Sequence, residues 1–155
     1  MNREKKSISH IHLIKGGYMN KWSGSSAVCI NEKGQVLMVL QGTPDEVKKW
    51  SVPSGGKETA ESFIDCCIRE VEEETGYIGE VLEEIKVKRT VIDVFEVEVY
   101  YYLVKIVGGN MKIQDPDQLI YDISWKSIEE LSELEFSFPE DKSFLQSYVK
   151  LKVFL

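Results

Sequence analysis

Apolar residues recur every three or four positions in the middle of the chain, a spacing that places side chains on one side of a helix. They are Ile64, Cys67, Ile68 and Val71. Gly76 follows the pattern and is suited to end a helix, because glycine adopts the left-handed conformation at little cost. The pattern predicts a helix over Glu61–Thr75 that packs on a sheet through Ile64, Ile68 and Val71.

Short apolar or alternating runs, separated by glycine, proline or charged residues, predict strands in the rest of the chain. The expected strands are Ser25–Asn31, Gln35–Gln41, Trp50–Pro53, Val81–Val91, Phe95–Val107, Met111–Gln114 and Leu119–Trp125. Two later helices are expected over Ser127–Leu134 and Pro139–Lys150, the second with a proline suited to the first turn. This order predicts an α/β fold.

The expected strand Phe95–Val107 alternates strictly, so its two faces can be assigned from the sequence. One face carries Phe95, Val97, Val99, Tyr101 and Leu103, and the other carries Glu96, Glu98, Tyr100 and Tyr102. The strands on either side of Asp93 are expected to form a hairpin.

Length and composition indicate one compact domain. The chain has 155 residues, 43% of them hydrophobic, and a net charge of −7. This charge disfavours extended nucleic-acid binding and anionic membranes. There is no apolar run long enough to span a bilayer. Cys29, Cys66 and Cys67 form no C-x-x-C pair and are expected to be small buried residues of a cytoplasmic protein.

Residues 1–21 stand apart as an N-terminal extension, and the domain is expected over residues 22–155. Two interpretations remain open: Met19 is the native start, or the extension packs as an extra strand. His10 and His12 share a strand face, which leaves an incidental pair or a metal site as alternatives.

The expected helix Glu61–Thr75 also carries an acidic face. Glu70, Glu73 and Glu74 lie three and four residues apart, so they share one side of the helix, and Arg69 is its only cation. Such a face is either a solvated surface or a site where a hard divalent cation relieves the repulsion between carboxylates.

A longer pattern decides between these alternatives. The spacing G-x5-E-x7-R-E-[aliphatic]-x-E-E-x-G is met at Gly55, Glu61, Arg69, Glu70, Val71, Glu73, Glu74 and Gly76. In this pattern the chain resembles the Nudix (MutT-like) hydrolases. It departs at Tyr77, where the family has a small aliphatic residue, and at Ser54, which replaces a glycine of the family's Pro-Gly-Gly turn.

The resemblance covers roughly residues 22–150 and implies a Nudix-type α/β/α sandwich with a mixed central β-sheet. It implies a metal-dependent hydrolase that cleaves the pyrophosphate bond of a nucleoside diphosphate linked to another moiety. Mg²⁺ or Mn²⁺ is the implied cofactor. A small-molecule nucleotide is the implied substrate.

The resemblance also assigns roles by position. Glu70, Glu73, Glu74 and Gly55 are the implied metal ligands, and these glutamates with Arg69 the implied catalytic residues. Glu61 and Gly76 are implied to be structural. Glu70 is favoured as the general base, with a carboxylate from a later segment, Glu96 or Glu98, as the alternative.

Several alternatives stay open at this stage. Tyr100 and Tyr102 either stack on a base or pack in the sheet. The protein is either an enzyme or a catalytically idle nucleotide sensor, and RNA decapping is a third reading that the acidic charge disfavours. The intact glutamates favour an enzyme. The oligomeric state is unknown, with a homodimer among the alternatives.

Overall fold

The computed structural model describes residues 20–113 and 119–153. The expected extension of residues 1–21, with His10, His12 and Met19, lies almost wholly outside the described residues. No helix in the described part of the chain is long and apolar enough to cross a membrane.

The chain forms seven strands and three helices in the described ranges. The strands are β1 (Asn20–Cys29), β2 (Val36–Gln41), β3 (Lys49–Ser51), β4 (Ser54–Gly56), β5 (Tyr77–Ile92), β6 (Phe95–Gly109) and β7 (Ile120–Lys126). The helices are α1 (Phe63–Thr75), α2 (Ile128–Leu131) and α3 (Pro139–Val153).

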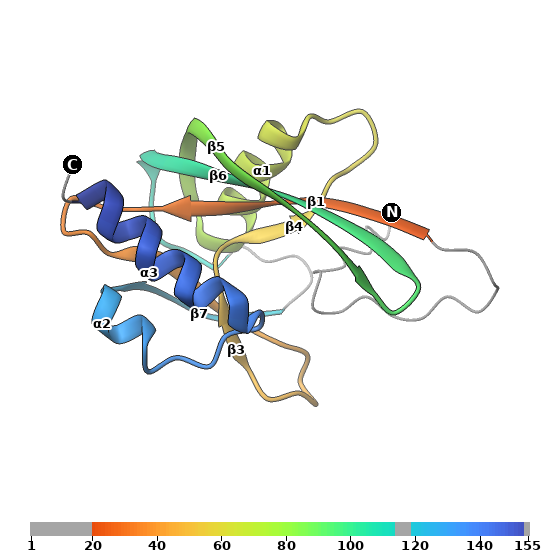
Figure 1. The fold of residues 1–155 in the computed structure, drawn as a ribbon. Helices are drawn as coiled ribbons and strands as arrows, with labels where there is room; N and C mark the ends of the chain where they lie inside the picture. The colour runs from red at the N-terminus through yellow and green to blue at the C-terminus, as the bar shows by residue number, and fades with distance from the viewer. Residues whose placement is uncertain (1–19, 114–118, 154–155) are drawn as a thin grey trace.

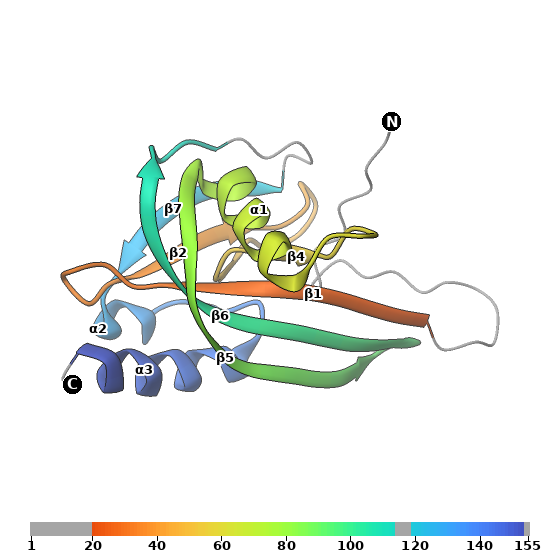
Figure 2. The same ribbon diagram turned by 90° about the horizontal axis from the view of Figure 1, so that it is seen from above.

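The strands form a four-stranded sheet of order β4-β1-β6-β5 and a three-stranded sheet of order β3-β2-β7. The first is mixed, because β1 and β6 run parallel while β1 and β4, and β5 and β6, run antiparallel. Helix α1 covers one face of this sheet and α3 the opposite face (Figure 1, Figure 2). The expected sandwich with a mixed central sheet is confirmed.

Alternation along β6 builds the two cores. Phe95, Val97, Val99 and Tyr101 join the cluster that includes Leu145 and Val149 of α3. Tyr102 and Val104 join the cluster that includes Cys67 and Val71 of α1. The two faces predicted from the sequence are therefore found on opposite sides of the sheet, and Asp93 lies in the turn of the β5–β6 hairpin.

Residues 111–113 of the expected strand Met111–Gln114 are not a strand, and Gln114 lies outside the described residues. Met111 and Ile113 are both about half exposed, at 45% and 46%. The backbone N–H of Lys112 donates to the carbonyl oxygen of Thr75 at 2.7 Å. The segment therefore closes the end of α1 instead of pairing in a sheet.

The predicted contact face of α1 is wrong in part. Val71 is fully buried and Ile68 half-buried, but Ile64 is 44% exposed. The buried residues of the helix are Cys66, Cys67, Glu70, Val71, Glu74 and Thr75. The hydrophobic pattern missed this face because two of its members are carboxylates, which are rarely buried unless they are paired.

The turn before α1 contains a backbone conformation that its residue disfavours. Ala60 is exposed and has a φ of +69°, in the left-handed region. A side chain beyond glycine costs about 1 kcal/mol in that region. We expect Ala60→Gly to stabilise the protein by up to about 1 kcal/mol, measured as the midpoint of urea unfolding.

The neighbouring exposed residue supplies the control, because Thr59 is not among the described non-glycine residues with positive φ. We expect Thr59→Gly to lower the free energy of unfolding, since it only adds freedom to the unfolded chain. A loss of stability in Ala60→Gly as large as that in Thr59→Gly would contradict the assigned strain.

Candidate functional site

Strand β4 and helix α1 face one another across the loop that joins them. β4 pairs antiparallel with β1, with Gly55 opposite Ser25. In the loop, the Lys57 ammonium donates to the carbonyl oxygens of Glu58 and Glu61 at 3.2 and 3.0 Å. These bonds fix the backbone that delivers Glu61 to the start of the helix.

Both ends of α1 are capped. The Ser62 hydroxyl accepts from the backbone N–H of Asp65 at 3.0 Å, which explains why the helix begins at Phe63. Gly76 has a φ of +81°, and its N–H donates to the carbonyl oxygen of Glu72 at 2.8 Å. The prediction that Gly76 ends the helix is confirmed.

A row of polar side chains on α1 lies against β4. Cys66, Glu70 and Glu74 are spaced four residues apart and are 0%, 1% and 4% exposed. The Cys66 thiol donates to the carbonyl oxygen of Gly55 at 3.6 Å. One oxygen of Glu74 accepts from the backbone N–H of Ser54 at 2.8 Å. The row therefore holds helix and strand together through hydrogen bonds.

Glu70 fits into the seam between α1 and β4 only because residue 55 is glycine. A Cβ atom at Gly55 would lie 2.3 Å from the carboxyl carbon of Glu70 and 2.5 Å from both of its oxygens. No such contact is tolerated, so glycine is required here by the close approach of the carboxylate. The glycine at position 55 and the buried glutamate at position 70 thus require one another.

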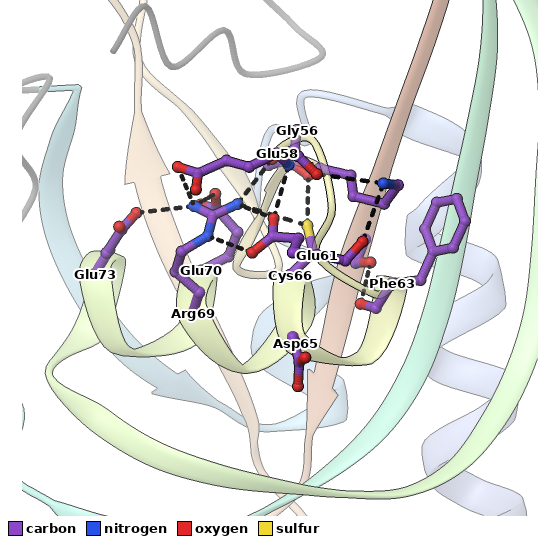
Figure 3. A network of polar contacts seen from close by, with 12 residues as sticks. Gly56, Glu58, Glu61, Phe63, Asp65, Cys66, Arg69, Glu70 and Glu73 are labelled. Atoms are coloured by element: carbon purple, nitrogen blue, oxygen red, sulfur yellow. Dashed lines mark hydrogen bonds and ion pairs between the residues drawn. The ribbon is translucent and has the colours of Figure 1, made fainter. Parts of the chain in front are cut away.

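Arg69 lies at the centre of the acidic residues, as Figure 3 shows. Its Nε and Nη2 donate to the two oxygens of Glu61 at 3.0 and 2.5 Å, and Nη2 also donates to the carbonyl oxygen of Gly56 at 2.9 Å. Its Nη1 donates to Glu70 at 2.7 Å and to Glu73 at 3.2 Å. One edge of the guanidinium therefore holds the loop, and the other meets the helix carboxylates.

Several carboxylates converge on one guanidinium in this cluster. Arg69 has the carboxylates of Glu58, Glu61, Glu70 and Glu73 within 4.0 Å. Its pKa is raised, chiefly by the hydrogen bonds to Glu61, so the guanidinium stays charged. Burial alone would raise the pKa of Glu61, but the bonds from Arg69 and from the Glu58 N–H, together with the Arg69 charge, lower it.

Cys66 is part of the same network. The Arg69 Nη2 donates to its sulfur at 3.9 Å. Burial raises the pKa of the thiol to about 12, so at neutral pH it is a protonated donor. Sequence reasoning expected Cys66 to be buried but gave it no part in this network. The available signal was its position four residues before Glu70. The prediction that Cys29, Cys66 and Cys67 are buried and unpaired is confirmed.

The structure brings together Gly55, Glu61, Arg69, Glu70, Glu73 and Glu74 as predicted. As these side chains are arranged, no three His, Cys, Asp or Glu residues of the described ranges could hold a metal ion. The glutamates and the β4 backbone nevertheless supply carboxylate and carbonyl oxygens, the ligand type that hard divalent cations prefer. The residues thus fit such a cation by chemistry, and Glu70 and Glu73 contact Arg69 in this arrangement.

Among the described residues, none of those predicted on β6 is a hydrogen-bond or ion-pair partner of Arg69. The Tyr100 ring stacks on Phe63 with centroids 4.0 Å apart, and Tyr102 is 5% exposed. Glu98 pairs with Lys21 and Arg89 at 3.7 and 3.2 Å. Glu96 and Glu98 border a depression of about 390 Å³ whose described lining includes none of residues 55–77.

The family model described as NUDIX domain matches residues 21–148. Nudix hydrolase 5 of Arabidopsis thaliana is 26% identical over 110 residues, which cover 69% of this chain and 36% of that protein. The m7GpppN-mRNA hydrolase of Saccharomyces cerevisiae is 45% identical over 51 residues, 33% of this chain and 5% of that protein. This chain thus spans only about a third, or less, of these two relatives.

A solved structure, the NUDIX hydrolase from Nitrosomonas europaea, superposes with a TM-score of 0.74 at 21% identity. The match covers 83% of this chain and 88% of that one. At this identity the superposition supports the fold. The family match, which covers most of the chain, shows that the protein belongs to the Nudix hydrolase family.

Proposed function

We propose that the protein is a metal-dependent hydrolase that cleaves the pyrophosphate bond of a nucleoside diphosphate linked to another moiety. The observation that carries this proposal is the convergence of four carboxylates on Arg69. Two further features support it: Glu70 is buried against Gly55, and Glu74 is buried against Ser54.

The carboxylates would hold Mg²⁺ or Mn²⁺. Glu70, Glu73 and Glu74 are the proposed ligands, with a backbone carbonyl at Ser54 or Gly55 beside them. When bound, the ion would polarise a phosphorus–oxygen bond and lower the pKa of a water molecule. A pyrophosphate is itself anionic and would be repelled by this cluster without a cation.

Glu70 and Glu73 could exchange their contact with Arg69 for a cation while Arg69 keeps its bonds to the loop before α1. Only its Nη1 contacts Glu70 and Glu73, so a cation that takes over these carboxylates leaves the Nε and Nη2 bonds to Glu61 and Gly56 in place. Arg69 and Glu61 are thus proposed to position the glutamates. Arg69 would also offer Nη1 to the anionic substrate.

The proton of the attacking water needs an acceptor. Glu70 is the proposed general base, since it is held on Gly55 at the centre of the row. Glu96 or Glu98 is the alternative, but Glu98 pairs with Lys21 and Arg89 and lies outside the cluster around Arg69. Tyr102 is too buried to stack on a base, and Tyr100 already stacks on Phe63.

The alternative function is a catalytically idle nucleotide sensor. A sensor has no need to keep the glutamates at all of the positions of the hydrolase pattern, including Glu70 and Glu74, which are buried. The discriminating experiment is a panel of nucleoside diphosphate derivatives, incubated with Mg²⁺ or Mn²⁺ and assayed for phosphate after coupling to a phosphatase. Nucleotide binding without turnover on every member would favour the sensor.

Divalent cations should stabilise the folded protein. Binding contributes about 1.4 kcal/mol when the free ion is at about ten times its dissociation constant. For a chain of this length that corresponds to a rise of roughly 3–6 °C in Tm. Calorimetry with millimolar Mg²⁺ or Mn²⁺, against an EDTA control at equal ionic strength, measures it. An unchanged Tm with both ions would count against the site.

Catalysis should depend on Glu73 and not on its neighbour. Glu73 contacts Arg69, whereas Glu72 is exposed on another side of α1. We expect Glu73→Gln to reduce kcat/KM by more than about tenfold, as loss of a metal ligand does. Glu72→Gln has the same change of charge on the same helix and should be nearly silent. A larger loss of kcat/KM in Glu72→Gln than in Glu73→Gln would refute the assignment of the metal site to the Glu73 side of α1.

Acid should remove the contribution of Glu61 to stability. The pKa of Glu61 is lowered in the folded state, so its ionised form stabilises the protein above the ordinary value of 4.5. We expect Glu61→Gln to cost about 1.5–3 kcal/mol at pH 7, the range for a bond to a charged group. This difference should shrink as the pH falls from about 5 through the lowered pKa, where wild-type Glu61 becomes protonated.

The measurement is urea unfolding of wild type and Glu61→Gln between pH 7 and pH 3. Glu72→Gln serves as the control, because Glu72 is exposed on the same helix, and its difference from wild type should stay small. A Glu61→Gln difference that remains constant over this range would mean that the bonds to Arg69 do not stabilise the fold.

A further inference from the structure

The row of buried polar residues on α1 begins one turn before the glutamates, at Cys66. Its thiol donates to the Gly55 carbonyl oxygen at 3.6 Å, and its sulfur accepts from the Arg69 Nη2 at 3.9 Å. Cys66 thus bonds both to the central residue of β4 and to the arginine. It is completely buried, at 0% exposure.

Three consecutive residues of β4 are fixed by the helix. The Ser54 N–H donates to Glu74 at 2.8 Å, and the Gly56 carbonyl accepts from Arg69 at 2.9 Å. Between them, Gly55 has the Glu70 carboxyl against its Cα and the Cys66 thiol on its carbonyl. Cys66 thus joins α1 to β4 one turn before Glu70.

The adjacent cysteine has different surroundings. Cys67 is 1% exposed and lies in the apolar cluster with Leu37, Val39 and Val71. No hydrogen bond from its thiol to the described residues accompanies this packing. The two thiols are therefore a matched pair, with equal chemistry and nearly equal burial but different neighbours.

We propose that Cys66 is a positioning residue of the active site, which holds the Gly55 backbone and Arg69 at the spacing that lets Glu70 and Glu73 bind a divalent cation. This rests on the proposed metal-dependent function. Cys66 does not touch the substrate or the ion. It acts by fixing α1 against β4, in the way that residues behind the ligands of other metal sites orient those ligands.

The test compares alanine and serine at both cysteines. Alanine and serine are nearly equal in size, and only serine keeps a hydrogen-bond donor. The primary readout is the dissociation constant for Mn²⁺ in the absence of substrate, from electron paramagnetic resonance of the free ion. The second is Tm without metal, and the third is the split between kcat and the KM for metal.

At position 66 we expect alanine to weaken Mn²⁺ binding by about tenfold or more. Serine should restore part of this loss, and the effect should appear in the KM for metal more than in kcat at saturating Mn²⁺. At position 67 both variants should bind Mn²⁺ like wild type. There serine should lower Tm more than alanine, because its hydroxyl is buried among apolar side chains.

Equal Mn²⁺ affinity of Cys66→Ala, Cys66→Ser and wild type would overturn the proposal and leave the proposed function intact. Loss of affinity in all four variants in proportion to their loss in Tm would also overturn it, because position 66 would then act only through general stability. A wild-type protein that binds no Mn²⁺ and hydrolyses no member of the panel would refute the proposed function itself.

Discussion

The arrangement depends on one guanidinium that serves two sets of partners. Nε and Nη2 of Arg69 hold Glu61 and the Gly56 carbonyl, which belong to the loop before the helix. Nη1 meets Glu70 and Glu73, which belong to the helix itself. A lysine has a point charge on a flexible stem and could not divide its contacts in this way. The planar fork therefore fixes the loop while the carboxylates on its other edge can change partners.

The sequence predicted the elements that carry this arrangement. The mixed sheet, the β5–β6 hairpin and the end of α1 at Gly76 were all expected and are present. Each has a local signal: alternation along β6, turn residues near Asp93, and a glycine at the helix end. Glu61, which the family pattern implied to be structural, accepts hydrogen bonds from Arg69 at 2.5 and 3.0 Å.

The sequence failed where tertiary contacts override a local pattern. Ile64 continues the apolar spacing of α1, yet it is exposed, because the buried face turns toward β4 and includes Glu70 and Glu74. Met111 and Ile113 alternate like a strand, yet Lys112 bonds to the end of the helix. A hydrophobicity pattern carries no information about these carboxylates. They are buried because Glu70 packs on Gly55 and bonds to Arg69, and because Glu74 bonds to the backbone of β4.

The hydrogen bonds between α1 and β4 both stabilise the fold and hold the carboxylates of the proposed active site in place. Each residue of β4 makes a polar contact with α1, so the helix cannot shift along the strand without breaking several hydrogen bonds together. Such a seam keeps Glu70 and Glu74 in place although neighbouring carboxylates in α1 repel one another. A cation bound between these carboxylates, as proposed, would relieve this repulsion. Fixed backbone contacts and crowded carboxylates thus meet on the same few residues. The contacts set where the carboxylates stand, and the crowding would favour the proposed cation, which in turn would attract an anionic phosphate.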